Sequence, residues 1–123
     1  MLNPPQNSKA FICSEPIDMR SSFDSLSGLV QFHFNQSALS GNLFVFFSRR
    51  RDRMKVLVWE IDGFVLYYKR LERGTFGWLH QIDLAQSCEM QSSDFALLLA
   101  GINSNKEKSR RSKFRHEVPL HLV

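Results

Sequence analysis

A dense group of basic side chains lies between two strongly apolar segments of the sequence. Residues 49 to 55 carry five basic side chains and a single acid, Asp52. The planar guanidinium of arginine can bind two phosphate oxygens at once, and clustered arginines are typical of surfaces that bind a nucleic-acid backbone. A charged loop that only keeps a sheet edge soluble has the same composition. These residue types nevertheless indicate an anion site, with phosphates as the expected ligand.

A β-hairpin is expected to bring further basic residues to this group. Segments 54–61 and 64–71 flank Asp62-Gly63, a dipeptide typical of two-residue hairpin turns. If this dipeptide forms the turn, Lys55 lies opposite Arg70, and such a like-charged pair favours an anion between its members. We call the resulting cluster the basic pole, and it is predicted to bind nucleic acid through Arg49, Arg50, Arg51, Arg53, Lys55, Arg70 and Arg73.

The acidic side chains near the basic pole do not have the arrangement of a catalytic site. A metal-assisted nuclease would need paired carboxylates, and the nearby acids are Asp52, Glu60, Asp62 and Glu72. Asp62 is expected in the turn, Glu60 on the opposite face of the ribbon, and the other two as ion-pair partners of arginines. The two cysteines and four histidines also lack the spacing of metal or nucleophile motifs. We therefore expect no catalysis, no metal and no cofactor.

Hydrophobic periodicity predicts the elements that position the basic pole. Apolar residues recur at helical spacing over 19–34, with Asp18 as the expected N-cap, and again from Phe95 to about Ile102. Strands are predicted at 10–14, 43–48, 54–61 and 64–71, with a further short strand at 76–82. The sequence therefore predicts an α+β fold. In this fold, a small antiparallel sheet of three to four strands packs on two helices in the order β-α-β-β-β-α.

Length and composition indicate one folded domain with polar ends. The chain has 123 residues, of which 43% are hydrophobic and 23% charged, close to the average of globular proteins. Residues 1–8 are expected to form a flexible arm, 9–103 a single α+β domain, and 104–123 a basic, flexible tail. The longest apolar run is far too short to span a membrane, and the first residues do not resemble a signal peptide. We therefore expect a cytoplasmic protein with reduced thiols.

The same central residues carry a resemblance to a known family. The segments "DMRSSFDSLSGLV" and "GNLFVFFSRRRDRMKVLVWEIDGFVLYYKRLERGTFGW" resemble the TnpB accessory protein of the bacterial insertion sequence sixty-six family, which is unrelated to the larger RNA-guided nuclease of that name. The match is dense over residues 18 to 78 and extends weakly through the "LLLAGI" segment. Ser48 departs from the family pattern, which commonly has arginine at this position.

This resemblance implies a role in the movement of a transposable element. It implies a small, non-catalytic protein encoded beside a separate DDE-type transposase, with the ends of the insertion sequence and the transposase as expected partners in the bacterial nucleoid. Among the polar positions of the motif, Arg20 and Asp24 on the first predicted helix are expected to bind a protein partner. Two hypotheses follow: a DNA-binding accessory factor that acts through the basic pole, or an adaptor that binds the transposase without contacting DNA. An exposed sheet edge would also allow a homodimer.

Overall fold

The structure is a computed structural model that describes residues 7–81 and 88–100. The chain divides into two units, residues 1–92 and 93–123, and each is described here by itself. The first unit contains all five strands and the first helix. Residues 93–99 of the second unit belong to helix α2 (Ser92–Leu99), whose first residue is the last residue of the first unit.

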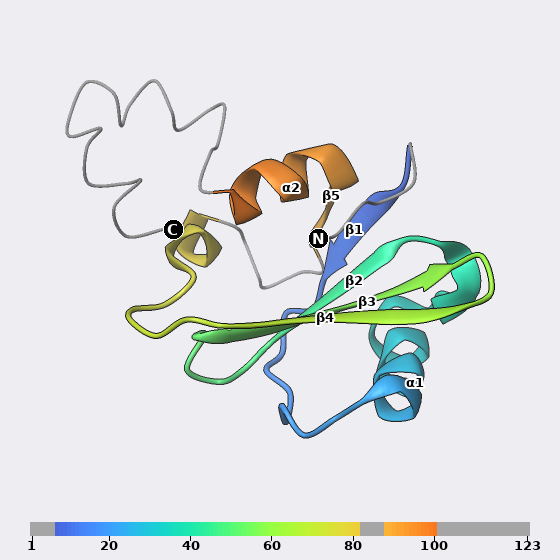
Figure 1. Ribbon diagram of the computed structural model, residues 1–123, viewed down its shortest axis with the longest axis horizontal. Helices are drawn as coiled ribbons and strands as arrows, with labels where there is room; N and C mark the ends of the chain where they lie inside the picture. Colours follow the sequence, from blue (N-terminus) through green and yellow to red (C-terminus); the bar gives the residue numbers. More distant parts are fainter. Residues whose placement is uncertain (1–6, 82–87, 101–123) are drawn as a thin grey trace. The chain divides into compact units, whose positions relative to one another are not determined.

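The first unit is built on one mixed sheet (Figure 1). Its strands are β1 (Lys9–Ile12), β2 (Leu43–Phe47), β3 (Arg53–Glu60), β4 (Gly63–Arg70) and β5 (Cys88–Gln91). They lie side by side in the order β4-β3-β2-β1-β5. β1 and β2 are parallel, whereas all other neighbours are antiparallel. This order places the β3–β4 hairpin at one edge of the sheet.

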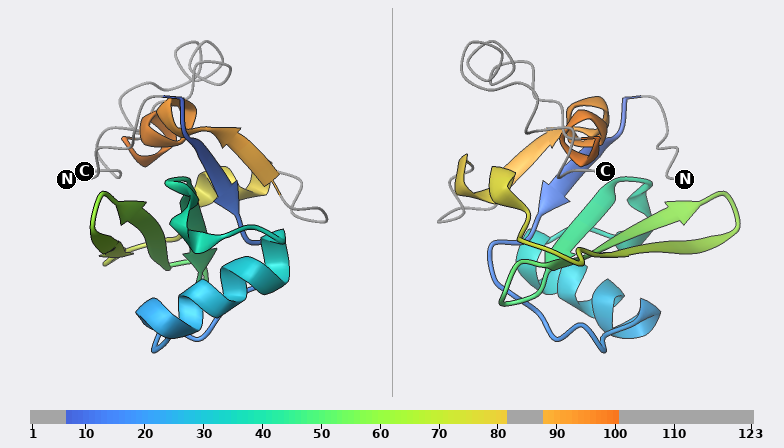
Figure 2. Two further views of the ribbon diagram at one scale, coloured as in Figure 1. Left: turned by 90° about the vertical axis from the view of Figure 1, so that its right-hand side faces the viewer. Right: turned by 60° about the vertical axis from the view of Figure 1, so that its left-hand side comes forward.

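Helix α1 (Phe23–Phe34) makes the connection that two parallel neighbours require. It links β1 to β2 and lies on one face of the sheet, as both views of Figure 2 show. Leu26 and Val30 point into the core with no exposed surface, and they pack with Phe44 and Leu57 of the sheet. Burial of such side chains contributes about 1.5–3 kcal/mol each. A short 3₁₀ helix, η1 (Ala38–Ser40), precedes β2.

The burial of each strand explains its composition. Every residue of β2 is buried, which is why this strand is a continuous apolar run rather than an alternating one. On the face opposite α1, Phe47 packs against the rings of Phe76 and Trp78, with centroids 5.5 and 5.6 Å away. β4 has no fully buried residue, as expected of a strand at the edge of a sheet.

The α+β class and the two helices are confirmed, but the predicted sheet was incomplete. The sheet has five strands rather than three to four, and it is mixed rather than purely antiparallel. The missed strand, β5, reads CEMQ, a short segment whose weak apolar alternation gives little signal. The strand predicted at 76–82 was wrong, because Gly77–Gln81 form a 3₁₀ helix, η2, and residue 82 lies outside the described residues.

Both helices begin or end at other residues than expected. α1 begins at Phe23 with Ser22 as its N-cap, so the predicted N-cap Asp18 was wrong. The Asp18 carboxylate instead accepts hydrogen bonds from the backbone N–H and the guanidinium of Arg20, which hold a turn ahead of the helix. α2 runs from Ser92 to Leu99, so it begins three residues before the predicted start at Phe95, and residues 101 and 102 of the predicted helix lie outside the described part of the chain.

The β3–β4 hairpin is confirmed, but its register differs by two residues from the predicted one. Ile61-Asp62 occupy the turn, and Lys55 lies opposite Tyr68. The predicted pairing of Lys55 with Arg70 was therefore wrong, because Arg53 occupies that place. A shift of two residues keeps every side chain on the same face, so the alternation of apolar residues fits both registers equally.

Some expectations fall on residues that the structure does not describe. Residues 1–6 and the predicted tail 104–123 lie outside the described ranges, and the limits of the predicted domain, 9–103, stay a prediction. Ser8, at the end of the predicted arm, is buried, and its hydroxyl donates to the Ser92 hydroxyl at 2.9 Å. Within residues 7–81 and 88–100, no helix is long and apolar enough to cross a membrane.

Candidate nucleic-acid interface

The turn between β2 and β3 holds most of the basic pole in a fixed backbone conformation. The N–H of Ser48 donates to the Arg53 carbonyl at 3.0 Å, and the N–H of Arg51 donates to the Ser48 carbonyl at 3.0 Å. The Ser48 hydroxyl donates to the Asp52 carboxylate at 3.1 Å and accepts from the Arg53 N–H at 3.2 Å. Ser48, which departs from the family pattern, therefore stabilises the turn through hydrogen bonds of both its backbone and its hydroxyl.

The segment that follows β4 is fastened to this turn. The Arg51 carbonyl accepts from the Phe76 N–H at 2.9 Å, and the Asp52 carbonyl accepts from the Leu71 N–H at 2.8 Å. Arg51 itself has a positive φ of 61°, a conformation that is uncommon for a residue other than glycine. The two loops that carry the basic residues therefore form one connected unit, with little freedom to rearrange on binding.

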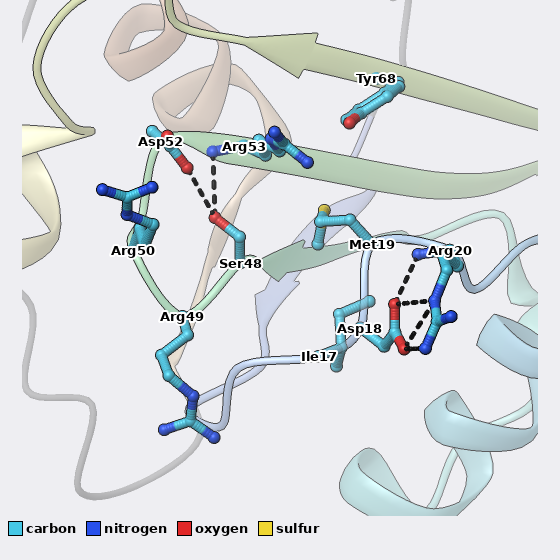
Figure 3. Close-up of a pocket in the computed structure, with 10 residues that line it drawn as sticks. All are labelled: Ile17, Asp18, Met19, Arg20, Ser48, Arg49, Arg50, Asp52, Arg53 and Tyr68. Carbon is cyan, nitrogen blue, oxygen red and sulfur yellow. Dashed lines mark hydrogen bonds and ion pairs between the residues drawn. The ribbon is translucent and has the colours of Figure 1, made fainter.

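A hollow of about 540 Å³ lies beside the turn (Figure 3). It is bounded by the β2–β3 turn, by the segment ahead of α1 and by Tyr68 of β4. Its lining residues are Ile17, Asp18, Met19, Arg20, Ser48, Arg49, Arg50, Asp52, Arg53 and Tyr68. Figure 3 shows the Asp18–Arg20 pair on one side of the hollow and Arg49 and Arg50 on the other. Four arginines and two acids thus share one open depression.

The arginines of the basic pole differ in what they already bind. Arg49, Arg50 and Arg53 are exposed, and among the described residues their guanidinium groups form no ion pair and no hydrogen bond. Arg70 is paired with Glu72 at 3.0 Å, at an exposed place where such a pair adds little stability. Arg73 is exposed on the segment after β4, and Arg51 is half-buried. The three exposed arginines of the turn are therefore the most available to an anion.

Lys55 is not part of this open surface. Only 6% of Lys55 is exposed, and its ammonium donates to the carbonyls of Met19 and Ser21 at 2.7 and 2.6 Å. Its place on β3 turns the side chain toward the α1 face, under the ring of Tyr68. The structure therefore gives Lys55 internal partners, in contrast to the neighbouring arginines with which it was grouped.

The predicted partner-binding residues lie in two different settings. The Arg20 guanidinium donates to Asp18 at 2.6 Å, and these hydrogen bonds lower the pKa of Asp18 to about 2. Arg20 lines the hollow together with the arginines of the turn. Asp24 is exposed in the first turn of α1, where a negative charge suits the positive end of the helix, and it does not line the hollow.

The described residues offer no arrangement for metal or thiol chemistry. Across residues 7–81 and 88–100, no three histidine, cysteine or acidic side chains are grouped as metal ligands would be. Burial raises the pKa of the thiols of Cys13 and Cys88, so both favour the less reactive protonated form.

Six of the ten residues that line the hollow were not among the predicted binding residues. They are Ile17, Asp18, Met19, Ser48, Asp52 and Tyr68. Tyr68 is 49% exposed, although aromatic residues in strands are more often buried. Its edge position could have been inferred from the alternation of β4. The approach of Met19 to the turn could not, because it depends on the path of the chain between β1 and α1.

The fold and the site define a small α+β protein with an arginine-bearing turn between two interior strands of its sheet, and comparison with known proteins supplies the family. Residues 8–109 match the model of the family described as IS66 Orf2 like protein, so the chain belongs to this family. Members of this transposition-associated family are, in general, non-catalytic accessory proteins.

Two relatives come from Sinorhizobium fredii (strain NBRC 101917 / NGR234). The chain is similar to the uncharacterized protein y4jC, with 29% identity over 92% of this chain and 95% of the relative. It is also similar to the uncharacterized protein y4hO, with 41% identity over 63% of this chain and 68% of the relative. No solved structure matches the chain. The family is therefore established by sequence.

Proposed function

We propose that this protein is a non-catalytic accessory factor for transposition that binds DNA phosphates through the arginines of the β2–β3 turn. The expected ligands are the ends of the insertion sequence, free or bound by the DDE-type transposase, which would place the protein at the bacterial nucleoid. Arg49, Arg50 and Arg53 form the primary contact in this proposal, and Arg70 and Arg73 extend it along the segment after β4.

The observation that supports this proposal is the presence of exposed arginines without acidic partners on a turn of fixed conformation. An arginine already paired with a carboxylate must lose that pair before it binds phosphate, whereas Arg49, Arg50 and Arg53 have no such pair among the described residues. The hydrogen bonds of Ser48 within the turn reduce the ordering entropy that binding would otherwise cost. Charge and rigidity together favour an extended polyanion as the ligand.

The first test is binding to labelled duplexes. Fluorescence anisotropy would compare a duplex that carries the terminal repeat of the element with a scrambled duplex of the same length. We expect both to bind, and we expect the triple variant Arg49→Gln, Arg50→Gln, Arg53→Gln to lose most of the affinity for both, because each phosphate contact adds to binding of any sequence. Tighter binding of the terminal repeat would show sequence recognition as well.

The alternative hypothesis, an adaptor that binds the transposase without contacting DNA, predicts another outcome of the same experiment. In that case neither duplex binds the purified protein at low salt, and the triple variant behaves like the wild type. Retention of the protein on immobilised transposase would then be the measurement that supports the adaptor.

A further inference from the structure

The outer edge of β4 is the longest strand edge without a neighbour in the described part of the chain. β4 pairs with β3 over eight consecutive residues, from Gly63 to Arg70, without a bulge, and it contains no proline. Within residues 7–81 and 88–100, no strand lies on its other side. Natural edge strands are usually short, bulged or interrupted by proline, because an open edge pairs readily with another strand.

The hydrogen-bond pattern shows which backbone groups face outward. Arg53 exchanges hydrogen bonds with Ser48 on the β2 side, so the alternate residues of β3, beginning with Met54, bond to β4. Their partners on β4 include Val65 and Tyr67. The residues between these partners direct their backbone N–H and C=O groups away from β3, and they are Phe64, Leu66, Tyr68 and Arg70.

Charge is distributed unequally along this edge. The tip of the hairpin carries Glu60, the last residue of β3, and Asp62 of the turn. The other end of β4 carries Lys69 and Arg70, and Arg70 is paired with Glu72 within the same chain. Asp62 is exposed and forms no ion pair among the described residues. An antiparallel copy of the same strand would place the acidic end of each hairpin beside the basic end of the other. The edge is therefore complementary in charge to itself, the property that a two-fold interface requires.

We propose that two copies of this protein pair through β4 in antiparallel orientation and form a continuous sheet across a two-fold axis. With Leu66 opposite Leu66 of the second copy, Asp62 lies opposite Arg70 and Phe64 lies opposite Tyr68. This register aligns outward-facing residues with one another and creates a charge pair and an aromatic pair on each side of the axis. Figure 2 shows the hairpin extending past the start of β2, because the pairs of β2 with β3 reach only as far as Leu57.

Exposed apolar surface along the strand supports the same interface. Val65 is 39% exposed and Tyr68 is 49% exposed, although both lie in the middle of an ordered strand. A neighbouring strand would cover both, one on each face of the extended sheet, because successive side chains alternate between faces. The interface would thus combine backbone hydrogen bonds with burial on both faces.

Sedimentation velocity over a series of protein concentrations tests this inference without DNA. We expect the wild type to convert from monomer to dimer as concentration rises. Asp62→Arg alone and Arg70→Asp alone should each weaken the dimer about tenfold, because each replaces two charge pairs by two repulsions. The combined variant should recover dimerisation, because it only exchanges the positions of the charges. Glu15→Arg, which reverses an exposed acidic charge between β1 and α1, is the matched control and should leave the dimer intact.

Three results would overturn the inference. They are a monomer at every concentration, a dimer that neither single variant weakens, and a combined variant that remains as weak as the singles. Thermal unfolding of each variant would show whether a weakened dimer results from loss of the fold. Both charged residues are exposed, so we expect every variant to remain folded, and Arg70→Asp also removes the like-charged pair with Arg53, which does not oppose folding.

Discussion

Lys55 and Tyr68 lie opposite each other on β3 and β4, with the Lys55 ammonium 5.0 Å from the centroid of the Tyr68 ring. The same ammonium donates to the backbone carbonyls of Met19 and Ser21, in the segment that leads into α1. One buried cation therefore joins the hairpin to the start of the helix. Lys55 thus stabilises the fold beside the exposed arginines of the β2–β3 turn, although it belongs to the same basic stretch of the sequence.

Replacement of Lys55 is predicted to destabilise the fold. Lys55→Met keeps most of the apolar side chain but leaves the Met19 and Ser21 carbonyls without their charged donor, which should lower the free energy of unfolding by about 2–3 kcal/mol. Urea denaturation would measure the change. Lys69→Met, on the same hairpin but with no hydrogen bond of its side chain among the described residues, is the control and should change it by less than about 0.5 kcal/mol. Equal effects of the two variants would contradict this role of Lys55.

The facing pair Arg53 and Arg70 is predicted to lower the stability of the fold while Arg53 contributes to DNA binding. Two like charges directly opposite each other on neighbouring strands are unfavourable, so Arg53→Gln should raise the free energy of unfolding by a few tenths to about 1 kcal/mol. The same variant should bind duplex DNA more weakly. Arg50→Gln is the comparison, because Arg50 has no cross-strand partner and its loss should affect binding alone. A less stable Arg53→Gln protein would show that the pair is not repulsive in the folded state.

The turn of the β3–β4 hairpin is predicted to be a site where stability can be gained. Ile61 is 97% exposed and has a positive φ of 48°, which is unfavourable for a β-branched side chain. Ile61→Asn and Ile61→Gly should each stabilise the protein by about 1 kcal/mol, because both residues adopt this conformation more readily. Ile61→Val keeps the β-branch and should change the melting temperature very little. A loss of stability in the Asn and Gly variants would argue against this turn conformation.

The ionisation of Asp18 is predicted to depend on Arg20. Hydrogen bonds from Arg20 lower the pKa of Asp18 from 3.8 to about 2, so the fold favours the charged carboxylate. The resulting stabilisation of the turn is present above the ordinary pKa and is lost as the pH falls toward 2. In a carboxyl NMR titration, Arg20→Gln should return the pKa of Asp18 toward 3.8, whereas Arg49→Gln should leave it unchanged. An unshifted pKa of Asp18 in the wild type would contradict the pairing.

The sequence predicted those features that depend on local pattern. Alternation and the turn dipeptide located the β3–β4 hairpin, and helical spacing located α1, because each signal lies within a few consecutive residues. The pairing of strands that are distant in the sequence could not be predicted from these local patterns. The parallel β1–β2 pair depends on the crossover through α1, and β5 pairs with β1 from nearly 80 residues away.

The candidate site shows the same division between local and long-range information. The density of arginines at 49–53 predicted a basic turn, and the structure places such a turn between β2 and β3, at the end of the hairpin opposite its tip. The observed register differs from the predicted one by two residues, so Lys55 lies opposite Tyr68 and not opposite Arg70. The burial of Lys55 could not be read from its type or neighbours, because it depends on two carbonyls more than 30 residues away. The same chain path brings Arg20 to the hollow.

The most direct test of the central claim is the salt dependence of DNA binding in two variants of equal charge. One variant replaces Arg49 and Arg50 of the turn by glutamine, and the other replaces Lys9 and Lys69, which lie outside it. We expect the plot of log affinity against log salt concentration to become shallower by about two units in the first variant and to stay close to the wild-type slope in the second. Equal slopes for the two variants, or no binding by the wild type at low salt, would contradict a phosphate site at the β2–β3 turn.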